Sequence, residues 1–307
     1  MIQQNIPLKE HSNFKIGGPA KFFLDVKNSD DLIAGLREWG GRGSIFVLGG
    51  GTNVLFSDAG FDGLVIKNSI KGIELRGNSL VVGAGEKFSD ILNYCIDNSL
   101  SGLEWSGGLP GTAGGAVRGN AGAFGGETKD NVEKVRSVNY VTLQDIERTN
   151  PKCGFSYRNS IFKSEAAGSE IITQVTFNVQ VRDRENIKAI IDKNIEYRKN
   201  KHPLEYPNLG SIFKNVLFDN IKEDKKLELM LYIKTDPLPV IPVAKLIFLA
   251  GLTGKRIGDV MISEKHTNFI VNMGEGKASQ VKELIKVVKE KIKEQFDVNL
   301  EEEIMYV

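Results

Sequence analysis

The sequence predicts an α+β protein of several domains, in which short strands and helices alternate along the chain. Its 307 residues are enough for two or three domains of ordinary size. Hydrophobic residues make up 41% and charged residues 26% of the chain, as in globular proteins and unlike disordered chains or coiled coils. The 33 glycines are unevenly distributed and gather in two clusters between strand-like runs. These observations predict packed domains with glycine-rich loops.

The charge and hydropathy of the chain exclude several classes of protein. The 40 Lys and Arg against 39 Asp and Glu leave a net charge of +1, whereas a general binder of nucleic-acid backbones carries a basic excess. Pro242 and Lys245 interrupt the most apolar stretch, so no run approaches the roughly 20 residues that span a bilayer. The N-terminus lacks a signal-peptide pattern, and two cysteines make no disulfide framework. We expect a soluble cytoplasmic monomer that binds neither nucleic acid nor membrane.

Residues 1–70 form the first predicted region, in which strands flank one helix. Apolar residues at helical spacing from Leu32 to Trp39 line one face of that helix, and Gly40 and Gly41 follow its end. The predicted strands are Lys21–Val26, Ile45–Leu48, Val54–Phe56 and Leu64–Ile66.

Residues 71–200 form the second predicted region and continue the same alternation. A helix from Phe88 to Ile96 gathers its apolar side chains on one side, so we expect Cys95 to be a buried thiol. A further helix is expected around Ile187–Arg198. The predicted strands are Leu80–Val82, Val135–Val141, Phe155–Tyr157 and Ile171–Val181.

Residues 201–307 form the third predicted region, which begins with a proline-containing linker, His202–Pro207. The pattern there is strand, helix, strand, helix, strand. The last helix has Ser279 as its expected N-cap, and the final strand is Leu300–Val307. The apolar stripe of that helix consists of Val281, Leu284, Ile285, Val288 and Ile292.

The two glycine clusters are the unusual feature of the sequence. Residues 106–127 hold nine glycines in 22 residues, and Gly49, Gly50 and Gly51 precede Thr52 and Asn53. Glycine-rich main chain exposes N–H groups and allows another molecule to approach closely, which suits anionic oxygens. The alternative for each glycine is an ordinary loop or a close-packed turn.

The surroundings of the clusters exclude two nucleotide-binding schemes. A Rossmann turn opens a helix directly after a strand, but strand-like Val54–Phe56 follows Asn53 here. The chain also has no Gly-Lys-Ser/Thr sequence, so there is no P-loop. A strand–glycine–strand arrangement favours a diphosphate held by main-chain amides, with the side chains of Thr52 and Asn53 adding hydrogen bonds.

Six motifs, in order along the chain, resemble one known family. They are Leu48-Gly-Gly-Gly-Thr-Asn-Val-Leu-Phe56; Leu109-Pro-Gly-Thr-Ala-Gly-Gly-Ala116 with Gly119-Asn-Ala-Gly-Ala123; Tyr157-Arg-Asn-Ser-Ile-Phe-Lys163; Gly210-Ser-Ile-Phe-Lys-Asn215; Gly251-Leu-Thr-Gly-Lys-Arg-Ile-Gly258 with Ser263-Glu-Lys-His-Thr-Asn-Phe-Ile-Val-Asn272; and Leu300-Glu-Glu-Glu-Ile304. Together they resemble the UDP-N-acetylenolpyruvoylglucosamine reductase (MurB) family of bacterial peptidoglycan synthesis. The short distance from Arg158 to Ser211 is similar to that of the class without an inserted tyrosine-bearing loop.

The resemblance implies a three-domain flavoenzyme that binds FAD non-covalently. Residues 1–70 and 71–200 would be the two parts of an FAD-binding module of the vanillyl-alcohol-oxidase type. Residues 201–307 would be an α+β substrate domain, whose last strand, 297–307, would return to the FAD module. NADPH would reduce the flavin, which would pass hydride to UDP-N-acetylglucosamine enolpyruvate and give UDP-N-acetylmuramate.

The resemblance also assigns three catalytic residues. Arg158 matches the catalytic arginine, whose planar fork suits a carboxylate or enolate. Ser211 matches the proton donor. Glu303 matches the second Glu of the terminal motif and is chosen over Glu301 by motif register alone. Read without the motifs, these residues would be a solvated strand arginine, a turn serine and part of an acidic tail.

The remaining predicted site residues follow from the same motifs. Scattered histidines, among them His11 and His202, lack companions at ligand spacing, so no metal site is expected. The predicted substrate-binding residues are Tyr157, Lys214, His266 and Asn268. The predicted cofactor-binding residues are Gly49, Gly50, Gly51, Thr52, Asn53, Gly111, Thr112, Ala113, Gly114, Gly115, Gly119, Asn120 and Ala121.

Two departures from the family pattern and two rival functions remain open at this stage. Leu209 stands where the family commonly has the smaller Ala, and Val216, which has a main-chain N–H and a freer φ, stands where it has Pro, so we expect the substrate loop to differ from the family pattern in geometry. The rivals are another FAD-dependent oxidase or dehydrogenase on the same scaffold, and a non-catalytic homologue that binds flavin or nucleotide.

Overall fold

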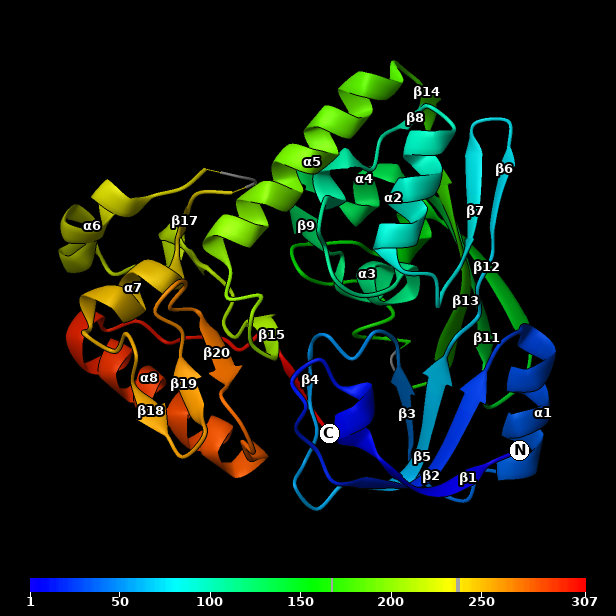
Figure 1. Cartoon of the computed structure of the whole chain (residues 1–307), viewed down its shortest axis with the longest axis horizontal. Coiled ribbons are helices and arrows are strands. Elements are labelled where there is room, and N and C mark those ends of the chain that lie inside the picture. Colours follow the sequence, from blue (N-terminus) through cyan, green and yellow to red (C-terminus); the bar gives the residue numbers. More distant parts are fainter. Residues whose placement is uncertain (167, 236–237) are drawn as a thin grey trace. The chain divides into compact units, whose positions relative to one another are not determined.

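The computed structural model describes residues 1–166, 168–235 and 238–307 and divides the chain into two compact units. The first unit combines Met1–Ile6, Ala20–Gly50 and Asp62–Tyr197, and the second combines Pro7–Pro19, Gly51–Phe61 and Arg198–Val307. Figure 1 shows the elements of each unit. The finer division into three domains stays a prediction. Within the described ranges, every helix is too short or too polar to cross a membrane.

The first unit contains a four-stranded sheet of order β1 (Gln3–Pro7), β2 (Pro19–Val26), β5 (Phe61–Asn68) and β3 (Ile45–Leu48). Helix α1 (Ser29–Trp39) packs on it through apolar residues such as Leu32 and Leu36. The Asn28 side chain accepts the Asp31 N–H at 2.8 Å, and Gly40 ends the helix at φ 60°. The predicted helix and strands of this region are confirmed, because local capping and hydrophobic periodicity agree.

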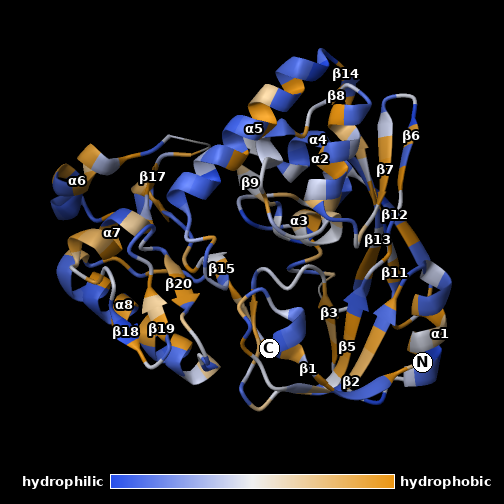
Figure 2. Ribbon diagram, in the orientation of Figure 1, coloured by the Kyte–Doolittle hydropathy of each residue, from blue (hydrophilic) through white to orange (hydrophobic). Residues whose placement is uncertain are grey.

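A five-stranded antiparallel sheet completes the first unit. Its order is β12 (Asp145–Thr149), β11 (Val132–Asn139), β13 (Glu170–Asn178), β7 (Ser79–Gly83) and β6 (Ile73–Arg76). Helices α2 (Phe88–Asp97), α3 (Ala113–Gly119) and α5 (Arg184–Lys201) share one hydrophobic core with it. Cys95 is buried there, as predicted, and burial raises the pKa of its thiol to about 12. Figure 2 shows β2, β3 and β5 as largely hydrophobic and α5 as largely hydrophilic.

Short elements connect the main ones in the first unit. They are β8 (Leu100–Ser101) paired with β14 (Gln180–Val181), β9 (Gly122–Ala123) paired with β10 (Gly126–Glu127), α4 (Thr128–Asn131), and the 3₁₀ turns Glu104–Ser106 and Asn150–Cys153. The predicted strand Ile171–Val181 is in fact two strands, β13 and β14. The predicted helix around Ile187–Arg198 is confirmed and runs longer at both ends.

The predicted strand Phe155–Tyr157 is wrong. Residues Ser156 and Asn159 instead form an isolated bridge, in which each N–H donates to the other's carbonyl at 3.1 Å. Gly154 at φ 56° and Arg158 at φ 55° lie in the left-handed region, which turns the chain sharply. The apolar and aromatic residues that suggested a strand therefore flank a tight turn.

The second unit is built on a four-stranded antiparallel sheet of order β15 (Asn208–Ser211), β20 (Phe269–Asn272), β19 (Val260–Ile262) and β18 (Arg256–Ile257). Helix α8 (Ala278–Phe296) contributes to its core the apolar stripe predicted from the sequence. Near the C-terminus, β21 (Met305–Tyr306) pairs in parallel with β4 (Val54–Leu55). The other elements are α6 (Glu223–Leu229), α7 (Val243–Leu249), β16 (Val216–Leu217) paired with β17 (Val240–Ile241), and the 3₁₀ turns Leu8–His11, Phe218–Asn220 and Met230–Tyr232.

Three expectations for the second unit need correction. It holds more elements than the predicted strand, helix, strand, helix, strand, because several strands have only two or three residues. Regular strand pairing at the C-terminus is confined to β21, although residue Glu302 forms an isolated bridge with Phe213. Ser279 is not the N-cap of α8, since the helix begins at Ala278.

A carboxylate far away in the sequence takes the place of that cap. Asp58 accepts the N–H groups of Ala278 at 2.7 Å and of Ser279 at 3.0 Å. Burial alone would raise the pKa of Asp58, but bonds from the Ser279 and Ala278 N–H groups and the Ser279 hydroxyl, with the charge of Lys277, hold it below its ordinary value. A cap from another segment leaves no local sequence signal.

Candidate functional site

The two glycine clusters approach each other within the first unit. A Cβ atom built on Gly49 would lie 2.9 Å from Thr112 Oγ1, closer than side chains normally pack. Lys67 Nζ donates to the Gly49 carbonyl, and burial lowers the pKa of this lysine. Thr112 pairs with Lys87 in an isolated bridge and caps α3 by accepting the Gly115 N–H at 3.4 Å. The structure therefore brings together Gly49 and Thr112, which the sequence predicted as cofactor contacts.

One face of α3 is bordered by open space. Gly115 and Gly119 are four residues apart, so they lie on the same face of the helix. A Cβ on Gly119 would meet no atom within 4 Å, and one on Gly115 would meet only Thr112 Oγ1 at 3.5 Å. Internal packing explains Gly126 instead, because its Cβ would lie 2.5 Å from Trp105. Packing does not account for glycine at these two positions, and the absence of a Cβ leaves room for another molecule to approach the main chain closely.

Several amides of this segment are already committed inside the protein. The Ala113 N–H donates to the Glu86 carbonyl at 2.9 Å, and the Gly114 N–H donates to the Ala84 carbonyl at 2.8 Å. The Ala121 N–H donates to the Ala116 carbonyl at 2.9 Å. At these three positions a cofactor would be held by close packing against the main chain rather than by amide hydrogen bonds.

Asn120 links the glycine-rich segment to the turn that carries Arg158. Its side chain is fully buried, and its Nδ2 donates to the Ser156 carbonyl at 3.0 Å while its Oδ1 accepts the Lys129 N–H at 3.0 Å. The Ser160 hydroxyl donates to the Arg118 carbonyl at 2.8 Å. These bonds hold a predicted cofactor segment beside the predicted catalytic arginine, and they give Asn120 a structural task that sequence reasoning missed.

Arg158 has a conformation that its surroundings enforce. Its φ of 55° is uncommon for a residue other than glycine and costs free energy, of order 1–3 kcal/mol. Lys163 Nζ donates to the Arg158 carbonyl at 3.0 Å, and the guanidinium carbon lies 5.9 Å from the centre of the Tyr157 ring. Strained arginines of this kind concentrate at functional sites, and the turn also contains the predicted substrate residue Tyr157.

In the second unit, the segment that follows Ser211 lies antiparallel to the segment that carries Glu303. The Glu303 N–H donates to the Ile212 carbonyl at 2.8 Å, and the Lys214 N–H donates to the Glu301 carbonyl at 2.9 Å. Phe213 and Glu302 form the bridge between these two bonds. Two predicted catalytic residues, 92 positions apart in the sequence, are thus neighbours along paired main chains.

Two predicted substrate residues hold this pair in place. Asn268 is buried, accepts the Phe213 N–H at 3.1 Å and donates to the Phe213 carbonyl at 2.9 Å. Lys214 forms an ion pair with the exposed Glu301. The amide of Asn268 is therefore committed to main chain beside Ser211, a position that supports the site without requiring contact with a ligand.

His266 lies in an aromatic cluster with His202 and Phe269. The centre of the His266 ring is 5.5 Å from that of His202 and 4.8 Å from that of Phe269. Burial lowers the pKa of each histidine to about 4, so both are neutral at pH 7. Among the described residues His266 Nδ1 is buried without a hydrogen-bond partner. His266 could thus meet a substrate as a neutral imidazole, not as a cation.

The second half of the first glycine cluster belongs to the second unit. Gly51 has φ 67°, and a Cβ there would lie 2.0 Å from the His11 carbonyl oxygen, so only glycine fits. Its carbonyl accepts the Asn13 N–H at 2.9 Å. Asn53 Nδ2 donates to the Glu303 carbonyl at 3.0 Å. The structure therefore places Asn53 against the main chain of a predicted catalytic residue.

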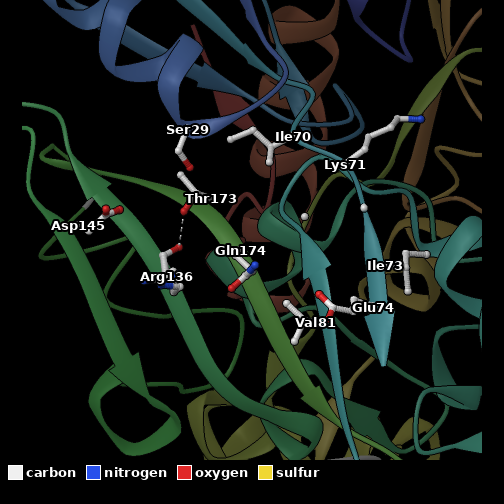
Figure 3. A pocket seen from close by; sticks show the side chains of 12 residues that line it. Ser29, Ile70, Lys71, Ile73, Glu74, Val81, Arg136, Asp145, Thr173 and Gln174 are labelled. Atoms are coloured by element: carbon white, nitrogen blue, oxygen red, sulfur yellow. Dashed lines mark hydrogen bonds between the residues drawn. The ribbon is translucent and has the colours of Figure 1, made fainter. Parts of the chain in front are cut away.

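A separate pocket of about 380 Å³ lies in the first unit, near the junction of its two sheets (Figure 3). It is lined by Ser29, Ile70, Lys71, Gly72, Ile73, Glu74, Val81, Gly83, Arg136, Asp145, Thr173 and Gln174. None of these is a predicted site residue. The Thr173 hydroxyl, which is buried, donates to the Arg136 carbonyl at 3.3 Å and is therefore already hydrogen-bonded within the protein.

Comparison with known proteins first gives the class of this protein. A family model described as an FAD binding domain matches residues 20–142, which include Gly49, Thr112 and α3. The close glycine contacts and the open face of α3 fit a flat dinucleotide cofactor. The class is therefore that of FAD-binding proteins, and the α+β fold with an FAD-binding domain is confirmed.

A second family model and the relatives then give the family. The C-terminal domain of UDP-N-acetylenolpyruvoylglucosamine reductase matches residues 202–307. The reductase of Clostridium novyi is 34% identical over 309 residues, covering 100% of this chain and 92% of that protein, and the reductase of Caldanaerobacter subterraneus is 36% identical, covering 99% and 92%. The crystal structure of the Thermus caldophilus reductase (MurB) superposes with a TM-score of 0.79 at 28% identity, covering 100% of this chain and 99% of that one. The chain belongs to the UDP-N-acetylenolpyruvoylglucosamine reductase family, as its motifs predicted.

Proposed function

We propose that this chain reduces UDP-N-acetylglucosamine enolpyruvate to UDP-N-acetylmuramate for peptidoglycan synthesis, with bound FAD as cofactor and NADPH as hydride donor. Identity along the whole chain to reductases named for this substrate supports the proposal. The structural observation that carries it is the bond from the Glu303 N–H to the Ile212 carbonyl, because this bond places Ser211 and Glu303 on paired segments.

The reaction sets two demands on the protein. The substrate's double bond is conjugated with a carboxylate, so addition of hydride to its methylene carbon leaves negative charge on the α-carbon and the carboxylate. When bound, FAD transfers the hydride between NADPH and the substrate. The chain's own residues must stabilise the negative charge and deliver one proton to the α-carbon.

Ser211 and Arg158 meet these two demands in the proposal. The Ser211 hydroxyl donates the proton; a serine is a weak acid in water, but the charged α-carbon is a strong base. The Arg158 guanidinium binds the carboxylate with two parallel hydrogen bonds, a geometry that a lysine cannot reproduce. The left-handed turn conformation of Arg158 sets the direction in which its side chain leaves the main chain.

Glu303 is the third catalytic residue in the proposal, and its main-chain bond to Ile212 supports this choice. The neighbouring acids have contacts of their own, since Glu301 pairs with Lys214, and Glu302 pairs with Lys289 and accepts the Tyr306 hydroxyl. Burial and Glu302 together raise the pKa of Tyr306, which therefore stays a neutral donor to that carboxylate. Of the three consecutive acids, Glu303 is the one whose main chain is tied to the residue after Ser211.

The cofactor is held, in this proposal, along the first glycine cluster and the open face of α3. Gly115 and Gly119 leave space for the cofactor to pack against α3. Gly49 and Thr112, which lie close together, would contact it from the neighbouring main chain. The other predicted cofactor residues are Gly50, Gly51, Thr52, Asn53, Gly111, Ala113, Gly114, Asn120 and Ala121, although the side chain of Asn53 donates to the main chain of Glu303. Tyr157, Lys214, His266 and Asn268 remain the predicted substrate set.

Sequential anaerobic reduction tests the proposal directly. The purified protein should show the absorbance of oxidised flavin, lose it on addition of NADPH, and regain it on addition of the enolpyruvyl nucleotide. Reoxidation by oxygen but not by the nucleotide would favour a different flavin oxidase. Protein that stays colourless after incubation with FAD would contradict both readings.

The finer expectations accompany the proposal. They are a cytoplasmic monomer without affinity for nucleic acid, and a three-part division near residues 70 and 200. The net charge of +1 supports the absence of nucleic-acid binding. Light scattering after size exclusion tests the monomer, and limited proteolysis tests the domain boundaries.

A further inference from the structure

The sequence predicts Asn53 as a cofactor contact, but its side chain forms a hydrogen bond with the main chain of Glu303. Its Nδ2 donates to the Glu303 carbonyl at 3.0 Å. Its own carbonyl accepts the Met305 N–H at 3.1 Å. One residue therefore contacts the main chain on both sides of Ile304, immediately before β4 pairs with β21.

Glu303 is consequently fixed from two directions. Its N–H donates to the Ile212 carbonyl at 2.8 Å, and its carbonyl accepts the side chain of Asn53. The first bond ties it to the segment of Ser211, and the second ties it to the end of the first glycine cluster. With both peptide groups held, the Cα–Cβ direction of Glu303 is set by its neighbours.

The chemistry of the amide group also favours this task over binding a diphosphate. A primary amide has two N–H donors and one carbonyl oxygen, and here one donor is already committed. Its oxygen only accepts hydrogen bonds, so it would face phosphate oxygens unfavourably.

We propose that Asn53 is a positioning residue that holds Glu303 in register with Ser211. The inference rests on the proposed catalytic role of Glu303. It predicts that loss of the Asn53 side chain impairs the step that uses Glu303 and leaves cofactor binding and flavin reduction unchanged. If Asn53 were instead a flavin ligand, loss of its side chain would weaken cofactor binding and slow flavin reduction as well.

The test compares the two half-reactions in Asn53→Ala, Asn53→Asp and the matched control Asn98→Ala. Asn98 also donates from Nδ2 to a main-chain carbonyl, that of Tyr94 at 2.9 Å, on an exposed surface of the first unit. Stopped-flow absorbance measures reduction by NADPH and reoxidation by the enolpyruvyl nucleotide, and fluorescence measures the FAD dissociation constant. Thermal melting confirms that each variant is folded.

The expected result is a reoxidation rate about 5–10-fold lower in Asn53→Ala, as loss of one hydrogen bond of ordinary strength implies. The decrease should be larger in Asn53→Asp, whose carboxylate repels the Glu303 carbonyl. Flavin reduction, the FAD dissociation constant and Asn98→Ala should match the unmodified protein. A weaker FAD complex with both half-reactions slowed would overturn the inference, and so would wild-type reoxidation.

A double variant separates failure of this inference from failure of the proposed function. If Asn53 acts through Glu303, the pair Asn53→Ala and Glu303→Gln should reoxidise no more slowly than Glu303→Gln alone. If the losses of reoxidation rate in the two single variants added in the double variant, Asn53 would not act through Glu303, but Glu303 would remain a catalytic residue. Wild-type reoxidation in Glu303→Gln would remove the catalytic assignment itself, and the inference with it.

Discussion

The glycine-rich segment of the first unit and the Ser211–Glu303 pair of the second differ in how they are assembled. The predicted cofactor residues of the first are nearly contiguous, because α3 and its capping residue Thr112 lie within residues 106–127 and Gly49 joins them from outside. The second brings together main chain at positions 53, 211–214 and 301–303. The comparison shows that a contiguous motif can locate a predicted main-chain site, whereas a predicted side-chain site also depends on contacts that no local pattern records.

The largest effect should come from the proton donor in the second unit. Ser211→Ala removes the hydroxyl, and loss of a general acid typically costs about 10²–10⁴-fold. Reoxidation by the enolpyruvyl nucleotide should fall by that factor, while reduction by NADPH should stay nearly intact. Stopped-flow traces of the two half-reactions measure both. Equal slowing of both would show that Ser211 is not a proton donor.

A smaller loss is expected for the arginine of the first unit. Arg158→Lys keeps the charge but loses the planar fork, and an electrostatic contact of this kind contributes about 10²-fold to turnover. Both residues carry a Cβ, so the left-handed φ of 55° is equally strained in each, and stability should change little. Steady-state turnover with matched melting curves gives the answer. Turnover like that of the unmodified protein would exclude Arg158 from the reaction.

The neutral histidine cluster should make the second unit sensitive to acid. The pKa of His202 and of His266 is about 4 in the folded protein, below the roughly 6.5 of an unfolded chain, so the unfolded state binds more protons between these values. Stability should therefore be complete above about pH 6.5 and fall as the pH approaches 4, by roughly 3 kcal/mol from the more buried His266 and by less from His202, whose charge water screens. Denaturant titrations at several pH values test this against His266→Phe, which should fall less steeply.

Two glycines of the first unit separate binding from folding. Gly115→Ala with Gly119→Ala fills open space and should stabilise the helix by up to about 1 kcal/mol per residue. The same methyl groups should weaken FAD binding by roughly tenfold. This factor corresponds to a total loss of about 1.4 kcal/mol of binding free energy, shared between the two methyl groups. Gly126→Ala, which clashes with Trp105, is the contrasting variant and should lower the melting temperature. Unaltered FAD affinity in the double variant would place the cofactor elsewhere.

Hydrophobic patterning predicted most elements of the first unit, since α1 and α2 each bury one regular face and β3 and β7 are short apolar runs. The same reasoning placed Phe155–Tyr157 in a strand, because residue types there suit a strand while the left-handed Arg158 turns the chain. In the second unit the two-residue strands fall below the length at which alternation can be detected. Sequence motifs named the candidate site residues, but the bonds of Asn53 and Asn120 depend on partners that lie far along the chain.

The smallest effect should come from Asp58, a residue of the second unit that local reasoning could not identify. Asp58→Ala removes the two acceptor contacts at the start of α8, and an N-cap substitution costs about 1 kcal/mol. Because the pKa of Asp58 is lowered on folding, its contribution should be complete above about pH 3.9 and be lost as the pH falls through the folded value. Urea titrations at pH 7 and pH 3 should give a clear difference from the unmodified protein at the first pH and a smaller one at the second. Ser279→Ala, which removes the cap expected from the sequence but leaves both N–H bonds to Asp58, should cost less; an equal loss in the two variants would restore Ser279 as the cap.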